Sequence, residues 1–329
     1  MFYRYFPLWK VFFEELGWKV VVSDRGGQRE SLIYLEDSCL PMKLLVTHAI
    51  SLKGKVDHLF APRLVSLHPS YIMCPKFRGA PDILRIALEG TVSILDETID
   101  LRSRNHSMLR SFIKVGKQLG ADEKKSKRAF QRAEQCFVTF LKTWEERMNR
   151  FPLKEIFPLA PPVPFPVRGQ RREEEMEQFH VAFVGHPYNL YDPDINKDIL
   201  SFAKGLGMRI VTPEMLSEKE IQSQMSGLSK EIYWSSGREI IGSLFHFLSG
   251  GADGVVFLTS FKCGIDALLQ ELVKRRVGGR EGGWAPLLVL SLDEHSGREG
   301  LTTRLEAFRD VLEQQRHLKP KHGTRHPTQ

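Results

Sequence analysis

The sequence is poor in cysteine and has no uninterrupted hydrophobic run long enough to span a membrane. Its longest apolar stretch, residues 240–261, contains His246, Asp253 and a glycine pair, which excludes a continuous lipid-facing helix. Glu14 and Glu15 interrupt the aromatic start, and no small-residue cleavage site of a secretory signal follows. The few cysteines are too dispersed for a disulfide framework. They are Cys39, Cys74, Cys136 and Cys263. We therefore expect a cytoplasmic protein with reduced thiols.

Several widespread enzyme motifs are also missing. No G-x-G-x-x-G follows a predicted strand, and no G-x-x-x-x-G-K-[ST] occurs, so the usual dinucleotide-binding fold and a P-loop are not supported. The G-x-S-x-G turn of hydrolases is absent as well.

The composition is that of a globular protein, and its hydrophobic pattern alternates between helices and short strands. Hydrophobic residues make up 42% and charged residues 26% of the 329 residues, a length that suggests about two domains. The alternation predicts an α/β fold with two parallel-sheet domains, Rossmann-like or flavodoxin-like, and a helical insertion between them. The N-terminal pattern predicts, in order, a helix over 8–16 that ends at Gly17, a strand over 18–23, a helix over 41–52, a strand over 56–61 and a helix over 81–88.

Changes in composition divide the chain into five segments. We predict an N-terminal α/β domain (1–90), a helical segment (91–150), a proline-rich linker (151–178), a C-terminal α/β domain (179–315) and a disordered basic tail (316–329). The second domain is expected to contain strands over 180–185, 209–212, 254–258 and 286–292, with helices over 194–206, 238–248, 265–275 and 303–315.

The start of the chain is unusual for a parallel α/β unit, which normally begins with a strand. Here a predicted helix comes almost at once, and residues 1–5 are barely long enough for a strand. We expect either a truncated first strand or a coding start that lies further upstream.

Positive charge gathers in residues 102–150, which hold 13 Lys/Arg and 5 Asp/Glu against a net charge of +7 for the whole chain. One hypothesis is a surface for nucleic acid or another anionic partner. The alternative, which we favour, is a solvated helix face, because no aromatic platform and no known nucleic-acid-binding motif accompanies the charge. We therefore do not expect nucleic acid as a partner.

Three of the cysteines lie where open α/β sheets bind ligands, in loops after strands or just before helices. Cys74 and Cys263 follow predicted strands, and Cys39 precedes a predicted helix. Amides near glycine and at helix starts favour thiolates, which are ligands for zinc or iron–sulfur clusters. The spacing contains no C-x-x-C, so simple buried thiols remain the alternative. Cys136 falls inside a predicted helix and is interpreted as a packing residue.

A set of short motifs carries a family resemblance that covers most of residues 2–313. The motifs are 5–10 (YFPLWK), 39–43 (CLPMK), 62–66 (PRLVS), 74–77 (CPKF), 185–192 (GHPYNLYD), 261–264 (FKCG) and 292–295 (LDEH). Together they resemble the 2-hydroxyacyl-CoA dehydratase component superfamily and, more narrowly, its CoA-enzyme-activase-related branch.

The resemblance implies a [4Fe–4S] cluster held by Cys39, Cys74 and Cys263, with a fourth position left to a non-protein or other ligand. It also implies a partner, an activator ATPase of the actin/sugar-kinase type, and radical dehydration of an acyl-CoA substrate. The chain is not itself that ATPase, because it lacks a glycine-rich Asp-x-Gly phosphate motif.

Other side chains in these motifs are candidates for supporting roles. Those near the proposed cluster or a substrate are Lys43, Lys76, Tyr188, Asn189 and Lys262. Those with acid, base or ligand chemistry are His186, Glu294 and His295. Ordinary surface or capping roles are the alternative for each of them.

The leading hypothesis is thus a cytoplasmic [4Fe–4S] protein that works in low-potential electron transfer or radical dehydration, as a lyase or reductase component. One alternative is a non-catalytic cluster or scaffold subunit that docks the activator. The other is an anion- or nucleic-acid-binding protein that uses residues 102–150. A homodimer or heterodimer is compatible with each, and no membrane partner is expected.

Overall fold

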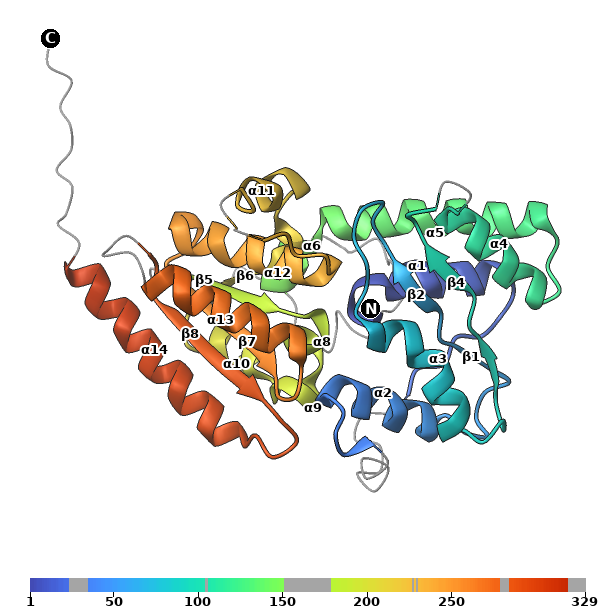
Figure 1. Ribbon diagram of the computed structural model, residues 1–329, viewed down its shortest axis with the longest axis horizontal. Coiled ribbons are helices and arrows are strands. Elements are labelled where there is room, and N and C mark those ends of the chain that lie inside the picture. The colour runs from blue at the N-terminus through green and yellow to red at the C-terminus, as the bar shows by residue number, and fades with distance from the viewer. Residues whose placement is uncertain are drawn as a thin grey trace, which may run out of the picture.

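The computed structural model describes residues 1–23, 35–103, 106–150, 179–226, 228, 230–278 and 284–318. The predicted linker (151–178) and all of the predicted tail beyond residue 318 lie outside these ranges. The fold is α/β with parallel sheets, as predicted, and consists of an N-terminal half up to residue 150 and a C-terminal half from residue 179, which lie side by side in Figure 1.

The C-terminal half is built on a four-stranded parallel sheet. Its strands are β5 (Phe179–Gly185), β6 (Met208–Val211), β7 (Gly254–Ser260) and β8 (Leu287–Leu292), in the order β6-β5-β7-β8. Their apolar runs form strands because the sheet is covered on both faces, and β7 is buried along its whole length. All four predicted strands are confirmed.

Helices cover both faces of this sheet (Figure 1). One face packs against α10 (Ile199–Gly205) and α14 (Arg298–Leu318), and the other against α12 (Ser235–His246) and α13 (Gly264–Gly278). The single helix predicted over 194–206 is instead divided into α9 (Pro193–Asn196) and α10, and a further short helix, α8 (Pro187–Tyr191), precedes them. Left-handed backbone at Lys197 and Asp198 separates α9 from α10, because an α-helix cannot continue through that conformation. The remaining short elements are η2 (Pro213–Met215), α11 (Glu218–Ser223) and η3 (Phe247–Gly251).

The N-terminal half has two pairs of short parallel strands. β1 (His58–Phe60) pairs with β3 (Ser93–Leu95), and β2 (Arg63–Ser66) pairs with β4 (Thr98–Asp100). Pro62 separates β1 from β2, because proline has no N–H to donate to a ladder.

The helices of this half pack on either side of β1 and β3. One group, α1 (Phe2–Glu15), α4 (Met108–Gln118) and α5 (Glu123–Lys142), shares a core that includes Leu95. A second group, α2 (Leu40–Ser51) and α3 (Pro75–Ala87), packs together with Val92. α6 (Trp144–Arg150) ends the half. Residues 91–150 contain α4, α5 and α6, and they also supply β3 and β4.

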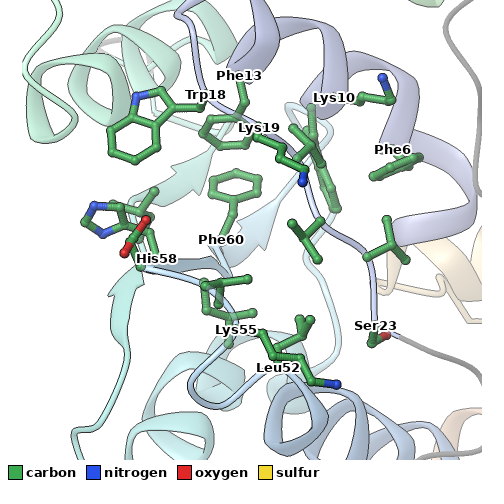
Figure 2. Close-up of a pocket in the computed structure, with 18 of the residues that line it drawn as sticks. Phe6, Lys10, Phe13, Trp18, Lys19, Ser23, Leu52, Lys55, His58 and Phe60 are labelled. Atoms are coloured by element: carbon green, nitrogen blue, oxygen red, sulfur yellow. The ribbon is translucent and has the colours of Figure 1, made fainter.

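The strand predicted over residues 18–23 is wrong. The helix before it ends as expected at Gly17, whose φ is +94°, but residues 18–23 follow without strand pairing. Instead they border a cavity of about 390 Å³ whose opposite side is β1 (Figure 2). A β-branched run becomes a strand only where a neighbouring strand takes up its backbone hydrogen bonds.

Across the parts of the chain that the structure describes, no helix combines the length and apolar character needed to cross a membrane.

Candidate functional site

Three helices begin beside the boundary between the two halves, and each has a cysteine directly before its first residue. Cys39 is the N-cap residue of α2 and Cys74 that of α3, while Cys263 immediately precedes α13. Proline in the first turn of α2 and α3 supports these starts, because its fixed φ suits a helix and the first N–H groups have no partner within it. The N-terminal end of a helix carries partial positive charge and free N–H groups, so it favours an anion.

Cys39, Cys74 and Cys263 all line one cavity of about 290 Å³. The N-terminal half contributes Cys39 and Cys74, and the C-terminal half contributes Cys263, together with His186 and Tyr188. The cavity therefore exists only where the two halves meet. Other side chains around it include Met42, His48, Lys76, Phe77, Asp192 and Ile265.

Two opposing effects act on the thiols. Burial raises the pKa of Cys74, although the backbone N–H groups of Lys76 and Phe77 act in the opposite direction. Burial, followed by the nearby Asp266 carboxylate, raises the pKa of Cys263 to about 12. These two thiols are therefore protonated in the metal-free protein near neutral pH. A bound metal would displace the protons and turn the thiols into thiolates.

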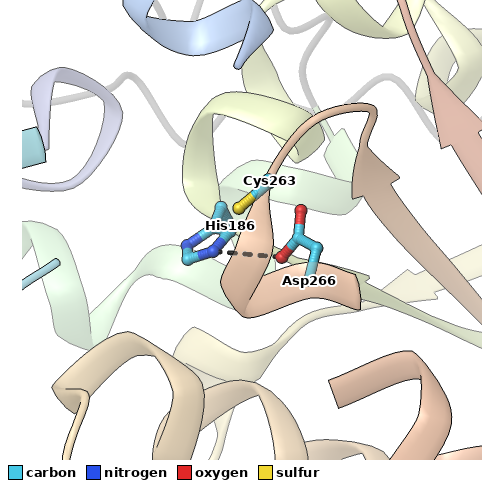
Figure 3. Close-up of side chains that lie close together, drawn as sticks. All are labelled: His186, Cys263 and Asp266. Carbon is cyan, nitrogen blue, oxygen red and sulfur yellow. Dashed lines mark ion pairs between the residues drawn. The ribbon is translucent and has the colours of Figure 1, made fainter. Parts of the chain in front are cut away.

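A second group of donor atoms overlaps this site. His186 Nε2 lies 3.1 Å from Asp266 Oδ1, and these two groups and the Cys263 sulfur offer ligand atoms that all lie within 4.8 Å of one another (Figure 3). His186 and Asp266 are buried, and neither Nε2 nor Oδ1 has a hydrogen-bond partner of good geometry among the described residues. Imidazole, thiolate and carboxylate together are a donor set that could bind a metal such as zinc or iron.

Buried hydrogen bonds fix the position of Asp266. Its Oδ2 accepts from the backbone N–H of Ser260 at 2.7 Å and from Asn189 Nδ2 at 3.4 Å. The Ser260 hydroxyl donates to Asn189 Oδ1 at 2.6 Å, and Asn189 Nδ2 also donates to the carbonyl of Leu258. This network connects β7, α8 and α13. It leaves Oδ1 of Asp266 directed at His186.

Tyr188 packs against the imidazole. The two rings are stacked, with centroids 4.8 Å apart and an angle of 17° between their planes. Burial raises the pKa of Tyr188 well above its usual value, and the Asp266 carboxylate and the three nearby thiols add to this effect. Tyr188 therefore stays a neutral phenol at the cavity wall.

The structure brings some of the sequence candidates to the cavity and leaves others away from it. Lys76 lines the cavity, and its Nζ lies 3.3 Å from Ser38 Oγ. Lys262 donates instead to the backbone carbonyl of Glu36. Glu294 pairs with Lys43, and His295 is exposed. Lys43, Glu294 and Lys262 thus make contacts between the two halves and do not line the cavity. Cys136 lies on α5 and does not line it either.

Sequence reasoning missed three polar residues near the thiols. Asp192 and His48 line the cavity, and Asp266 lies behind it. A signal for Asp266 was present, since an acid in the first turn of a helix, three residues after Cys263, lies on the same side as that cysteine. His48 and Asp192 carry no such signal, because only the meeting of the two halves brings them to the thiols.

A comparison with family models identifies the family of the chain. The model of the CoA enzyme activase uncharacterised domain (DUF2229) matches residues 1–216, about two thirds of the chain. The chain belongs to this family. No curated protein sequence matches it. The family match confirms the CoA-enzyme-activase-related resemblance. Within the matched region of this CoA enzyme activase domain lie Cys39, Cys74 and His186, while Cys263 and Asp266 come after its end.

Proposed function

We propose that this chain binds a [4Fe–4S] cluster through Cys39, Cys74 and Cys263 and acts in low-potential, one-electron chemistry. The observation that carries the proposal is that three thiols, each at the start of a different helix, line one cavity between the halves. Thiolates are the usual protein ligands of such clusters. We further propose an activator ATPase of the actin/sugar-kinase type as electron donor and an acyl-CoA as substrate, in line with the family resemblance.

The surroundings of the thiols suit an anionic cofactor. Three helix N-termini direct partial positive charge at the site, and backbone N–H groups already donate to Cys74 and Cys263. Hydrogen bonds to cluster sulfurs and the exclusion of solvent are two of the means by which a protein tunes a cluster's reduction potential. A bound cluster would supply a single electron at a time, while Tyr188 and the neighbouring apolar side chains keep water away from it.

Three cysteines leave one iron without a thiolate, and His186 is the side chain placed to complete the donor set. It lines the same cavity as the thiols, at the N-terminal end of α8. The stacked Tyr188 ring and the fixed Asp266 carboxylate hold the imidazole in position. Such outer contacts orient a metal-binding histidine. If the iron is instead left open to a substrate oxygen, His186 is the side chain of this cavity that would exchange a proton there.

Anaerobic reconstitution tests the proposal. The wild-type protein should bind about four irons and four sulfides per chain, with broad absorbance in the visible range and an EPR signal on reduction. Cys39→Ala, Cys74→Ala and Cys263→Ala should each lose most of the iron. Cys136→Ala is the matched control and should retain it. Colourless, iron-free wild-type protein would refute the cluster.

The group formed by His186, Cys263 and Asp266 favours a second candidate, a mononuclear metal site. In that case the protein should hold about one zinc or iron and no sulfide. His186→Ala would then remove the metal, whereas Cys39→Ala would leave it bound. Metal and sulfide analysis of these two variants separates the candidates.

A catalytic component and a non-catalytic docking subunit differ in turnover. Incubation of the reconstituted chain with activator, ATP, reductant and a panel of hydroxyacyl-CoA compounds should yield dehydrated product if the chain is catalytic. ATP-dependent reduction of the chain without any product would support the docking role.

A further inference from the structure

A further cavity at the boundary of the two halves has a buried arginine in its wall. Its volume is about 360 Å³, and its lining includes His68 and Tyr71 from the N-terminal half and Arg238 from the C-terminal half. His186 and Tyr188 line both this cavity and the thiol cavity, so their rings belong to a wall that the two cavities share. None of the three thiols lines the further cavity. It is therefore a separate site that adjoins the first.

The charge of Arg238 has no close counter-ion. Its side chain is 9% exposed, and the carboxylate within 4 Å of it among the described residues is that of Glu231, with Nη1 and Oε1 3.9 Å apart. A guanidinium has five N–H donors, of which one is taken by Gln222 Oε1. The group lies over the Tyr71 ring, 4.0 Å from the ring centre. Because a buried charge without a close partner is costly, this guanidinium favours an anion beside it.

The carboxylates that line the cavity are engaged elsewhere. Both carboxylate oxygens of Glu239 accept from Arg4 Nη1, at 2.5 and 2.6 Å. Glu214 Oε2 accepts from the Tyr191 hydroxyl at 2.7 Å. The side chain of Glu218 is 82% exposed to solvent. None of these three acids thus serves as the counter-ion of the buried guanidinium.

The start of α12 adds neutral donors to the same wall. Ser235 and Ser236, its first two residues, line the cavity, and the N-cap residue Trp234 makes no capping hydrogen bond with its side chain. The backbone N–H groups of Ser236 and Gly237 have no partner among the described residues. The buried hydroxyl of Ser236 has none among them either. Unpaired N–H groups at a helix start, together with an unpaired hydroxyl and a buried guanidinium, are donors that suit an oxyanion.

Apolar side chains form much of the remaining wall. They are Leu67, Met73, Phe77, Leu216 and Ile221. The cavity also lies at the carboxyl ends of β5 and β6, where open α/β sheets bind ligands, because His186 and Pro213 follow those strands. Its volume is within the range of small-molecule sites. An inorganic ion alone would leave the apolar wall without contacts.

We propose that this cavity binds a small organic oxyanion, a phosphate or carboxylate on an apolar stem. Arg238, the Ser236 hydroxyl and the N–H groups at the start of α12 hold the charged end, and the apolar wall contacts the stem. Phosphate and carboxylate share this chemistry, since both accept charge-assisted hydrogen bonds. The site does not depend on which metal the thiols bind. Its ligand would touch the wall that contains His186 and Tyr188.

Isothermal titration calorimetry of the full, metal-free chain tests the proposal. The probes are butyl phosphate and pentanoate, their stemless counterparts inorganic phosphate and acetate, and pentanol as the neutral control. One or both organic anions should bind saturably at one site, and the tighter of the two identifies the oxyanion. An organic anion that binds should do so at least about tenfold more tightly than its stemless counterpart, because burial of the stem adds to affinity. Pentanol should not bind measurably.

Two positions locate the site. Ser236→Ala should weaken binding by about threefold to tenfold, because a donor to the anion is lost. The melting temperature of the ligand-free variant should stay the same or rise, since the hydroxyl has no partner to lose. Arg238→Gln should weaken binding at least about tenfold. Arg238→Lys should weaken it less, because lysine keeps the charge without the planar fork.

Arg128→Gln, at an exposed position of α5, is the matched control and should bind as the wild type does. The proposal is overturned if neither organic anion binds saturably, or if the stemless anions or pentanol bind equally well. Unchanged affinity in Ser236→Ala overturns it too, and this variant decides the matter even where Arg238→Gln does not fold. A cluster that fails to assemble on the thiols leaves these binding results as they are, so the two proposals stand or fall separately.

Discussion

Lys43 Nζ lies 2.7 Å from Glu294 Oε1, and this ion pair joins α2 of the N-terminal half to the loop after β8 in the C-terminal half. The Lys43 side chain is only 5% exposed, so its charge depends on that carboxylate for compensation. The pair lies one helical turn from Cys39. The ion pair therefore helps to fix the start of α2, and with it Cys39, against the C-terminal half.

Glu294→Gln should lower the free energy of unfolding by about 1–2 kcal/mol near neutral pH, because a buried ammonium loses its charged partner. The hydrogen bond from Lys43 lowers the pKa of Glu294 below its ordinary 4.5. The stabilisation is therefore fully present above pH 4.5 and is lost as pH falls through the native pKa. Urea unfolding at two pH values measures this difference. Glu306→Gln, at an exposed position of α14, should show no such change.

Asp266→Asn should raise the reactivity of Cys263 in the metal-free protein. The Asp266 carboxylate raises the pKa of this thiol, so its neutralisation should increase the thiolate fraction and the alkylation rate by up to about tenfold. Mass spectrometry after timed iodoacetamide treatment measures the rate. Cys74 provides the control within the same molecule, because burial, the backbone N–H groups of Lys76 and Phe77 and the charges of Cys39 and Lys76 are the main influences on its pKa. An equal acceleration at both cysteines would indicate general loosening and contradict the electrostatic cause.

Gly185→Ala should destabilise the sheet by about 1–3 kcal/mol, the usual cost of overpacking. A Cβ at this position would lie 2.5 Å from the backbone oxygen of Leu258 on β7. Because His186 follows directly, the variant should also disturb the group formed by His186, Cys263 and Asp266. Gly205→Ala in α10 is the control, since a Cβ there meets nothing within 4 Å and alanine favours a helix. Thermal unfolding of the two variants in parallel tests the prediction, and equal melting temperatures would contradict it.

Glu214→Gln should change the pH dependence of stability. Burial, and then the charge of Glu239, raise the pKa of Glu214 above its ordinary 4.5. Between pH 4.5 and the native pKa the folded state binds the extra proton, so wild-type stability falls as pH rises through that window. Glutamine can still accept from the Tyr191 hydroxyl, which lies 2.7 Å from Glu214 Oε2. Melting temperatures of the variant should decline less over this window, and parallel curves for the two proteins would rule out the effect.

The C-terminal sheet was predictable because its strands are continuous apolar runs between turn residues, a pattern that needs no knowledge of neighbours. Residues 18–23 show the limit of that reasoning. Val20, Val21 and Val22 have the same local preference as β5, yet no strand among the described residues supplies the hydrogen bonds. Strand formation depends on residues far away in the chain, which a local pattern does not contain.

The candidate site was predictable in part, for a related reason. Cys39, Cys74 and Cys263 could be selected because each stands before a predicted helix or after a predicted strand, and these positions follow from local sequence. The contact of His186 with Asp266 could not, because it depends on β5 and β7 lying side by side in the C-terminal sheet. The pairing of Lys43 with Glu294 could not either, because it arises from the packing of one half on the other. Their physical basis is tertiary geometry.

The division of the three thiols between the two halves determines when during synthesis they can come together. Cys39 and Cys74 leave the ribosome before Cys263 and before the strand β7 that precedes it. Domains fold in turn during translation. Assembly of the proposed cluster would then wait until the C-terminal sheet has formed, because a nascent chain that stalls before residue 263 lacks one of the three thiols.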